Sequence, residues 1–385
     1  MHCGERSRPA PGGPPVPGER RPGGPARWGC VEHGCRTAGT GQRTPNARGP
    51  PVRPETARWF ACRTWQQPTW SVAELVSAKR ARSVSVVLPA LNEAATVGGI
   101  VTAIRPLTTS ACGRLVDEIV VMDSGSTDRT CAAAAEAGAR VFRRDDVLPT
   151  VDVRPGKGEV LWRSLAATTG DVVVFIDADL IGFEADFVPA LLGPLLTEAD
   201  PMLVKGFYRR PLGPDTGTAD GDGGGRVTEI LVRPLLAQLR PELGGVIQPI
   251  GGEYAARREF LASASFAPGY GVDIGLLLDA HERYGLPGLA QVNLGARRHR
   301  NRDLPELGVM SGHVLSAVLD RAGPEPGTDG ADSLTQFVQV GGEWLPREHR
   351  VPRADRPPMR ALRNPSPAGR GGEPGWAGQH DPATS

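Results

Sequence analysis

Residues 170–179 read GDVVVFIDAD, an apolar run that ends in two aspartates. The part at 172–177 is rich in β-branched residues, which is typical of a buried parallel strand. Ligands of open α/β sheets bind at the carboxyl ends of the strands, where Asp177 and Asp179 would stand. Two carboxylates this close repel each other unless a cation or ligand donors neutralise them. The stretch therefore predicts a divalent metal carrying a diphosphate, or alternatively a strand-ending turn with solvated aspartates.

The rest of the chain shows strands and helices in alternation around this run. Before it, strands are predicted at 84–88, 117–122 and 139–142, and helices at 70–81, 92–106, 128–137 and 159–167. After it, helices are predicted at 187–196, 228–239, 270–283 and 304–319, and strands at 202–208 and 290–294. The alternation predicts an α/β fold with a doubly wound, mostly parallel sheet and right-handed crossovers.

The two ends of the chain differ from its middle in composition. The 385 residues include 50 glycines and 37 prolines, and most of this excess lies at the ends. Such segments bury too little apolar surface to offset the entropy of ordering, so we predict disorder at 1–68 and at 347–385. A chain that begins near Trp65 is therefore expected to keep full activity.

Charge and hydropathy exclude several classes of function. A net charge of +1 provides no global field that would hold nucleic acid or an acidic membrane. The chain contains no apolar run of signal-peptide or bilayer-spanning length. The sequence therefore predicts a soluble, cytoplasmic protein without an integral membrane segment.

Polar residues gather in loops at the predicted strand ends. The loops read PALNE at 89–93, DSGSTD at 123–128, GKG at 156–158 and DAD at 177–179. Each of the first two could be only a helix-capping turn. A lysine between glycines at a helix start suits a phosphate, although the spacing is not that of a Walker A loop.

Taken in this order, the four loops resemble those of the GT-A nucleotide-sugar glycosyltransferases, which have a Rossmann-like sheet. The second half of the chain looks like the actinobacterial glucosyl-3-phosphoglycerate synthases, with GGRVTE at 224–229, GEY at 252–254, GYGVDIG at 269–275, QVNLG at 291–295 and RHRNR at 298–302. The resemblance covers about 70–337. It implies a nucleotide-sugar-binding half at 69–206 and an acceptor-binding half at 207–346.

The resemblance also implies roles for individual residues. The UDP-sugar would be bound by Pro89, Ala90, Leu91, Glu93, Ser124, Lys157, Asp177 and Ala178. The 3-phosphoglycerate would be bound by Gly225, Arg226 and Thr228, and Mg²⁺ (or Mn²⁺) by Asp179 and His299. Catalytic roles would fall to Asp273 at the sugar hydroxyls and to Arg297 and Asn301 near the diphosphate. The chain departs from the family at Ala178, where serine is frequent, and at Asp273, where glutamate is expected.

The resemblance implies a retaining, Mg-dependent transferase that moves glucose from UDP-glucose to 3-phosphoglycerate, as a first step towards methylglucose lipopolysaccharide or glucosylglycerate. A homodimer is also implied, and no nucleic-acid partner. Three alternatives stay open at this point. They are a mannosyl-3-phosphoglycerate synthase using a GDP-sugar, an inverting GT-A transferase acting on a lipid phosphate or polysaccharide, and a noncatalytic nucleotide-sugar-binding module.

Overall fold

The structure is a computed structural model that describes residues 53–109, 111, 113–209, 225–296, 303–322, 333–340, 343–350 and 354–363. Its strands are β1 (Thr64–Trp65), β2 (Val84–Ala90), β3 (Glu118–Asp123), β4 (Arg140–Arg143), β5 (Val172–Phe175), β6 (Leu203–Arg209), β7 (Tyr254–Arg257), β8 (Leu289–Ala296), β9 (Ser333–Val340) and β10 (Glu343–Arg350). Its α-helices are α1 (Pro54–Arg63), α2 (Val72–Lys79), α3 (Val97–Ile104), α4 (Thr130–Glu136), α5 (Lys157–Ala167), α6 (Phe187–Thr197), α7 (Arg233–Leu239), α8 (Arg258–Leu261), α9 (Val272–Tyr284), α10 (Leu304–Ala322) and α11 (Met359–Arg363).

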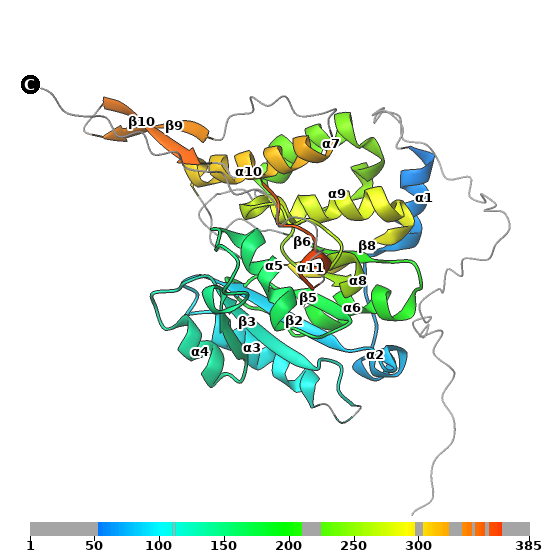
Figure 1. Ribbon diagram of the computed structural model, residues 1–385. Helices are drawn as coiled ribbons and strands as arrows, with labels where there is room; N and C mark the ends of the chain where they lie inside the picture. Colours follow the sequence, from blue (N-terminus) through cyan, green and yellow to red (C-terminus); the bar gives the residue numbers. More distant parts are fainter. Residues whose placement is uncertain are drawn as a thin grey trace, which may run out of the picture. The chain divides into compact units, whose positions relative to one another are not determined.

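The central sheet has eight strands in the order β1-β8-β6-β7-β5-β2-β3-β4 (Figure 1). Strand β7 runs antiparallel to both of its neighbours, and the other neighbouring pairs are parallel. The predicted mostly parallel α/β sheet is therefore confirmed. Because β7 is antiparallel, its first residue, Tyr254, lies opposite Phe175 at the end of β5. The amino end of β7 thus meets the carboxyl end of the strand that carries the aspartates.

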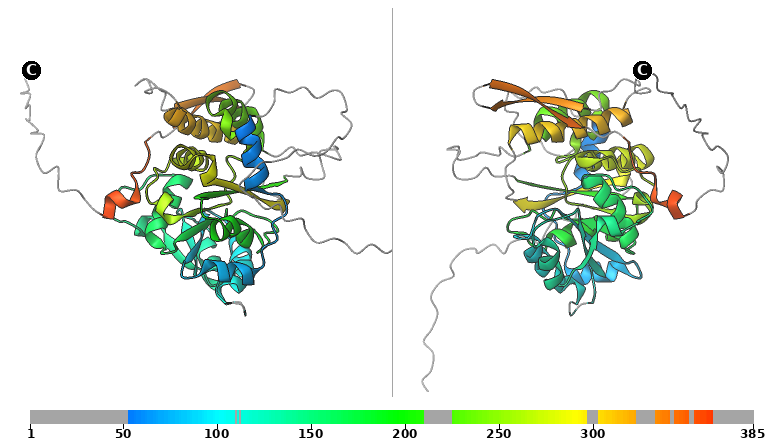
Figure 2. Two further views of the ribbon diagram at one scale, coloured as in Figure 1. Left: turned by 90° about the vertical axis from the view of Figure 1, so that its right-hand side faces the viewer. Right: turned by 60° about the vertical axis from the view of Figure 1, so that its left-hand side comes forward.

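Helices cover both faces of the sheet. Alternate residues of β2 face opposite sides: Val86 and Leu88 pack with α3 and α6, whereas Val87 packs with α5 and α9. Figure 2 shows α9 and α10 on one side of the sheet and α2, α3 and α4 on the other. This alternation explains why β2 and β5 read as continuous apolar runs, since a strand covered on both faces buries every side chain.

The predicted disorder at 1–68 is wrong for its last part, because α1 and β1 are ordered. Trp59 is 5% exposed and its indole N–H donates to the carbonyl of Leu289 at 2.9 Å. The Thr56 hydroxyl donates to the carbonyl of Glu242 at 3.0 Å. In β1, Thr64 pairs with Gln291 of β8. Tertiary contacts with β8 and with Glu242 order this segment, so its own composition gave no signal.

We expect a chain that begins at Trp65 to be less stable than one that begins at Arg53. Removing Trp59 exposes part of the core and leaves a buried carbonyl without its donor, and the single change Trp59→Ala should cost about 3–5 kcal/mol of unfolding free energy. Urea denaturation measures this. The neighbouring substitution Arg58→Ala, at an exposed position, is the control. Equal midpoints for both starting points would contradict the expectation.

The predicted disorder at 347–385 is wrong for 347–350 and 354–363, and the rest of that range lies outside the described residues. Strand β10 continues to Arg350, and residues 354–363 pack on the domain. Met359 is 3% exposed and Arg356 is 6% exposed. The indole N–H of Trp162 in α5 donates to the carbonyl of Pro357 at 3.0 Å. The segment 354–363 is rich in arginine and proline, so its composition predicts disorder. It is ordered by contacts with buried residues that are distant in the sequence, such as Trp162.

Candidate active site

The loops after β2 and β3 form one rim. The backbone N–H of Ser124 donates to the carbonyl of Ala90 at 2.8 Å. Asn92 has a positive φ of 58° and accepts from the backbone N–H of Thr127 at 2.9 Å, while its own N–H donates to the Ser126 hydroxyl at 2.9 Å. From the sequence alone, each of these two loops could have been only a helix-capping turn. These side chains join the two loops instead, which fixes the rim before any ligand binds.

The predicted uridine-binding residues lie on this rim. Ala90 is buried and Pro89 is half-buried, whereas Leu91 is 51% exposed. The hydroxyl of Ser124 accepts from Arg144 at 3.2 Å. Glu93 stands at the start of the turn before α3, where its N–H donates to Thr130 at 2.8 Å. An exposed leucine beside fixed polar groups is a surface on which a planar base can rest.

The Asp-Ala-Asp triplet follows β5 and is tied to the rim. The hydroxyl of Thr96 donates to the carbonyl of Ala178 at 2.6 Å, so the middle residue of the triplet is held through its backbone. Asp177 packs against Gly252, where any Cβ would overlap the carboxylate. Asp177 and Asp179 are half-buried. The antiparallel β7 thus brings a glycine against the first carboxylate.

Lys157 joins two of the predicted site residues. Its ammonium lies 2.8 Å from Asp177 Oδ1 and 3.1 Å from Asp273 Oδ2, although 116 residues separate it from the latter. Burial opposes the charge, but Asp177 and Asp273 together raise the pKa of Lys157 well above its ordinary value. The lysine therefore stays charged and holds the two carboxylates close to each other.

The glycines on both sides of Lys157 have a packing role. Gly156 has a φ of 102°, and a Cβ there would lie 2.8 Å from the Cα of Gly269. A Cβ on Gly158 would overlap the carbonyl of Ala267. The start of α5 can therefore lie directly on the 267–269 turn that precedes α9. Asp273 is in the first turn of α9, so this close approach places it beside Lys157.

A second lysine, Lys205 of β6, lies near Lys157 and Asp273. The sequence analysis did not identify it as a site residue. It is 2% exposed, donates to the carbonyl of Gly251 at 2.6 Å and lies 4.4 Å from the ring centre of Tyr254. Burial lowers the pKa of Lys205 to about 8, with Asp273 opposing that shift and Lys157 adding to it. Burial also raises the pKa of Asp273, against the effect of both lysines. The signal in the sequence that could have identified Lys205 is that it is a lysine inside the apolar run 202–208.

We expect Lys205 to make stability depend on pH above neutrality. Its folded pKa of about 8 lies below the ordinary value of 10.5. Between these values the unfolded chain binds more protons, so the free energy of unfolding should rise with pH by up to about 3 kcal/mol. The measurement is urea unfolding of the wild type and of Lys205→Met from pH 7 to pH 10. The free energy of unfolding of the wild type should rise relative to that of Lys205→Met as the pH rises. If the two free energies changed with pH in parallel, the lowered pKa of Lys205 would be contradicted.

The predicted acceptor residues stand at the start of the π-helix η4 (Thr228–Val232), which the helix α7 follows directly. Gly225 has a φ of 84°, Arg226 is exposed and Thr228 is 3% exposed. Three predicted residues, Arg297, His299 and Asn301, lie outside the described residues.

The oxygens of Asp177 and Asp179 at one sheet edge suit a hard divalent cation. Within the described ranges, no three His, Cys, Asp or Glu side chains gather to hold a metal ion. The two aspartates would supply only part of a metal site, and His299, the predicted further ligand, lies outside the described ranges.

The chain is similar to proteins of known activity. The profile of the family described as "Glycosyl transferase family 2" matches residues 85–222. The glucosyl-3-phosphoglycerate synthase of Mycolicibacterium smegmatis is 58% identical over 306 residues, which cover 80% of this chain and 98% of that protein. The chain belongs to the glucosyl-3-phosphoglycerate synthase family. The synthase of Mycobacterium tuberculosis (strain H37Rv) is 55% identical, with 78% of this chain and 92% of that protein covered.

Solved structures of this family share the fold. The M. tuberculosis synthase in complex with Mn²⁺, UDP-glucose and phosphoglyceric acid superposes with a TM-score of 0.70 at 54% identity, covering 78% of this chain and 98% of that one. The same enzyme with Mg²⁺ and UDP also has a TM-score of 0.70. Among the helices of the described ranges, none is long and apolar enough to cross a membrane.

Proposed function

We propose that this chain transfers glucose from UDP-glucose to 3-phosphoglycerate, giving glucosyl-3-phosphoglycerate and UDP. The observation that carries the proposal is the ionic cluster of Lys157, Asp177 and Asp273 at the edge of the sheet, beside the rim of the β2 and β3 loops. It is supported by the 58% identity to a synthase of that name. A related synthase was crystallised with Mn²⁺, UDP-glucose and phosphoglyceric acid.

On the donor side, the rim would bind UDP. The exposed face of Leu91 would lie against the base, with Pro89, Ala90, Glu93 and Ser124 around it. Their backbones are already fixed by hydrogen bonds between the two loops. A preformed pocket loses little conformational entropy on binding, which favours affinity for the nucleotide.

At the diphosphate, Asp179 and His299 would hold Mg²⁺ or Mn²⁺, with Asp177 next to them. The cation, when bound, would neutralise charge that develops on the departing UDP. Lys157 fixes the orientation of the Asp177 carboxylate through the contact of 2.8 Å. The chain thus supplies two oriented carboxylates at the strand end, while Ala178 contributes only its backbone.

Asp273 would bind the sugar. Its Oδ2 accepts from Lys157, whereas Oδ1 is buried and has no hydrogen-bond partner among the described residues. A buried carboxylate oxygen without a donor is costly, and a sugar hydroxyl would remove that cost. Burial raises the pKa of this group, and Lys157 and Lys205 oppose the rise.

On the acceptor side, Arg226 with Gly225 and Thr228 would bind the phosphate and carboxylate of 3-phosphoglycerate, and Arg297 and Asn301 would lie near the diphosphate. Retention of the anomeric configuration, by front-face attack of the acceptor hydroxyl, is part of the proposal. A homodimer is also part of the proposal. A cytoplasmic location is part of it too, because both substrates are highly charged and do not cross membranes unaided.

We expect Arg226→Ala to raise KM for 3-phosphoglycerate roughly tenfold to a hundredfold and to leave KM for UDP-glucose nearly unchanged. A charge-assisted hydrogen bond contributes about 1.5–3 kcal/mol, and it would be lost on the acceptor side only. Steady-state kinetics with each substrate varied provide the measurement. Arg129→Ala, at the exposed N-cap position before α4 and paired with Glu136, is the control. An unchanged KM for phosphoglycerate would remove Arg226 from the acceptor site.

The proposed function is tested by UDP release from UDP-glucose and Mg²⁺, with and without 3-phosphoglycerate. Release should depend on phosphoglycerate, and the anomeric proton of the product should show an α linkage by NMR. Reaction with GDP-mannose in place of UDP-glucose would favour the mannosyl alternative. Absence of release with either sugar would contradict the proposal.

A further inference from the structure

We infer that Arg356 is a positioning residue for the proposed transfer: it clamps the first turn of α5 to the turn before α9 and so holds Lys157 at Asp273. This inference rests on the proposed function. Arg356 belongs to the segment 354–363, which follows the β9–β10 hairpin in the chain and ends in α11. Figures 1 and 2 show α11 in red.

The side chain of Arg356 is buried against α5. Its Nε lies 2.5 Å from Glu159 Oε2 and its Nη2 lies 2.7 Å from Glu159 Oε1, a two-point ion pair. Nη2 also donates to the carbonyl of Asp152, and the guanidinium lies 5.1 Å from the ring centre of Trp162. Every contact is to α5 or to the loop that leads into it. A two-point guanidinium–carboxylate pair fixes orientation as well as distance.

The backbone of the same residue is bound to the turn before α9. The N–H of Arg356 donates to the carbonyl of Phe266 at 3.1 Å, and the two residues form an antiparallel bridge. On α11, the N–H of Arg360 donates to the carbonyl of Ala262 at 3.2 Å. Arg356 therefore contacts α5 with its side chain and Phe266 with its main chain.

The contacts of Arg356 with Glu159 and with Phe266 are close in the sequence to the residues that join Lys157 to Asp273. Glu159 is two residues after Lys157, and Phe266 comes directly before Ala267, whose carbonyl touches Gly158. A small rotation of α5 relative to the 266–269 turn would change the distance of 3.1 Å between Lys157 and Asp273. A misplacement of about 1 Å can cost roughly a hundredfold in rate.

Glu159 is held from a second direction as well. Arg163 Nε lies 2.7 Å from its Oε1, and the guanidinium of Arg163 also donates to the carbonyls of Val147, Leu148, Val151 and Asp152. Burial opposes ionisation of Glu159, yet hydrogen bonds from Arg356 and Arg163 bring its pKa below the ordinary value. Loss of Arg356 would leave one guanidinium to hold both the loop and the helix.

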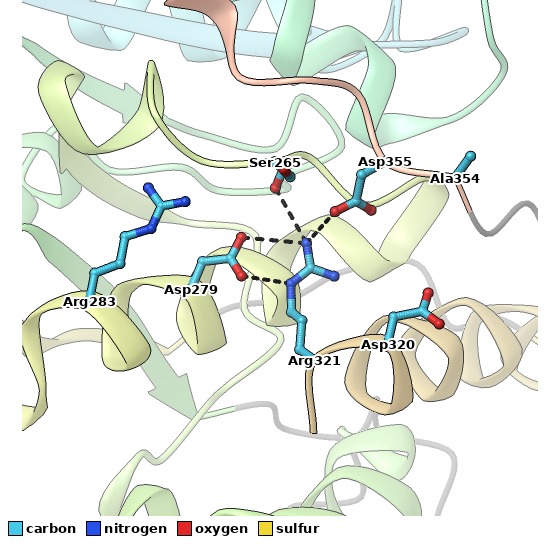
Figure 3. A pocket seen from close by; sticks show the side chains of 7 residues that line it. All are labelled: Ser265, Asp279, Arg283, Asp320, Arg321, Ala354 and Asp355. Carbon is cyan, nitrogen blue, oxygen red and sulfur yellow. Dashed lines mark hydrogen bonds and ion pairs between the residues drawn. The ribbon is translucent and has the colours of Figure 1, made fainter. Parts of the chain in front are cut away.

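The start of the segment has its own anchors. Figure 3 shows Arg321 of α10 between Asp279 of α9 and Asp355. Its Nε lies 2.8 Å from Asp279 Oδ1 and its Nη2 lies 2.7 Å from Asp355 Oδ2. Arg154, in the loop before α5, donates to the carbonyl of Ala354 at 2.9 Å. The segment is thus fixed on α9 and α10 before Arg356 reaches α5.

The test compares Arg356→Met and Arg356→Lys with Arg360→Met, whose side chain is exposed on the same segment. We expect Arg356→Met to lower kcat/KM for UDP release about tenfold or more and Arg356→Lys to recover only part, because lysine cannot make the two-point pair. Arg360→Met should match the wild type. Activity of Arg356→Met equal to that of Arg360→Met would overturn the inference.

A general loss of stability is separated by a double-mutant cycle with Lys157→Met. If Arg356 acts through Lys157, adding Arg356→Met to Lys157→Met should change kcat/KM by less than about twofold. A full tenfold further loss would overturn the positioning role. The Lys157→Met enzyme retains measurable release if its loss is about a hundredfold, as expected from displacement of this group.

Hydrogen exchange on the full chain gives a readout that does not require activity. Arg356→Met should raise amide exchange at 156–163 and 266–275 and leave α3 (Val97–Ile104) unchanged. Exchange raised equally in α3, or in neither segment, would overturn the inference. If the wild type releases no UDP, the proposed function fails, whereas this pattern of exchange still decides whether Arg356 holds the two segments together.

Discussion

Replacing Asp179 with alanine is expected to lower kcat for UDP release about a thousandfold, because a cation at a leaving group contributes several kcal/mol and each 1.36 kcal/mol is tenfold in rate. The fold should remain intact, since Asp179 is half-buried in the turn after β5 and contributes no strand pairing. The measurement is steady-state release with Mg²⁺ varied, together with circular dichroism.

The control for this change is Asp186→Ala. Asp186 is exposed at the start of α6 and its side chain makes no capping hydrogen bond. That variant should keep wild-type kinetics. Turnover of Asp179→Ala within a fewfold of the wild type, at every Mg²⁺ concentration, would remove Asp179 from the proposed metal site.

Replacing Lys157 with methionine is expected to damage stability and activity together. The change leaves Asp177 and Asp273 close to each other without the ammonium between them. Breaking a buried ion pair by removing one partner costs about 3–5 kcal/mol. The activity should fall roughly a hundredfold, because both carboxylates lose the group that positions them. Urea unfolding and UDP release provide the two measurements.

Two further variants separate the effects on stability and activity. Asp273→Asn added to Lys157→Met should recover part of the stability, since one unpaired buried charge is removed, but none of the activity. Lys79→Met serves as the matched control because Lys79 is a buried lysine, 2.5 Å from Asp117, that lies outside the proposed site. It should lose stability and keep kcat. If Lys157→Met were as stable as the wild type, the cluster would not be the ionic centre described above.

The architecture of this protein was largely determined by local sequence. Continuous apolar runs such as 172–177 become strands buried on both faces, and segments of helical period become helices, because these patterns depend on side chains two to four residues apart. Ser71 and Glu74 form the capping box of α2 in this way. The aspartates at the end of β5 were predicted for the same reason, since strand ends in an open sheet share one edge.

The site itself depends on tertiary structure. Lys157 and Asp273 meet across 116 residues because Gly156 and Gly158 allow α5 to lie on the turn before α9. Gly252 meets Asp177 because β7 enters the sheet antiparallel beside β5. No local period in the sequence specifies either approach.

The same reason explains the errors at the two ends of the chain. Trp59 in α1 and Arg356 before α11 stand in segments whose composition predicts disorder, and both are ordered by distant partners, the carbonyl of Leu289 and the carboxylate of Glu159. Order there comes from the free energy of burial and pairing in the folded state. That free energy exists only once β8 and α5 are already in place, so composition alone could not reveal it.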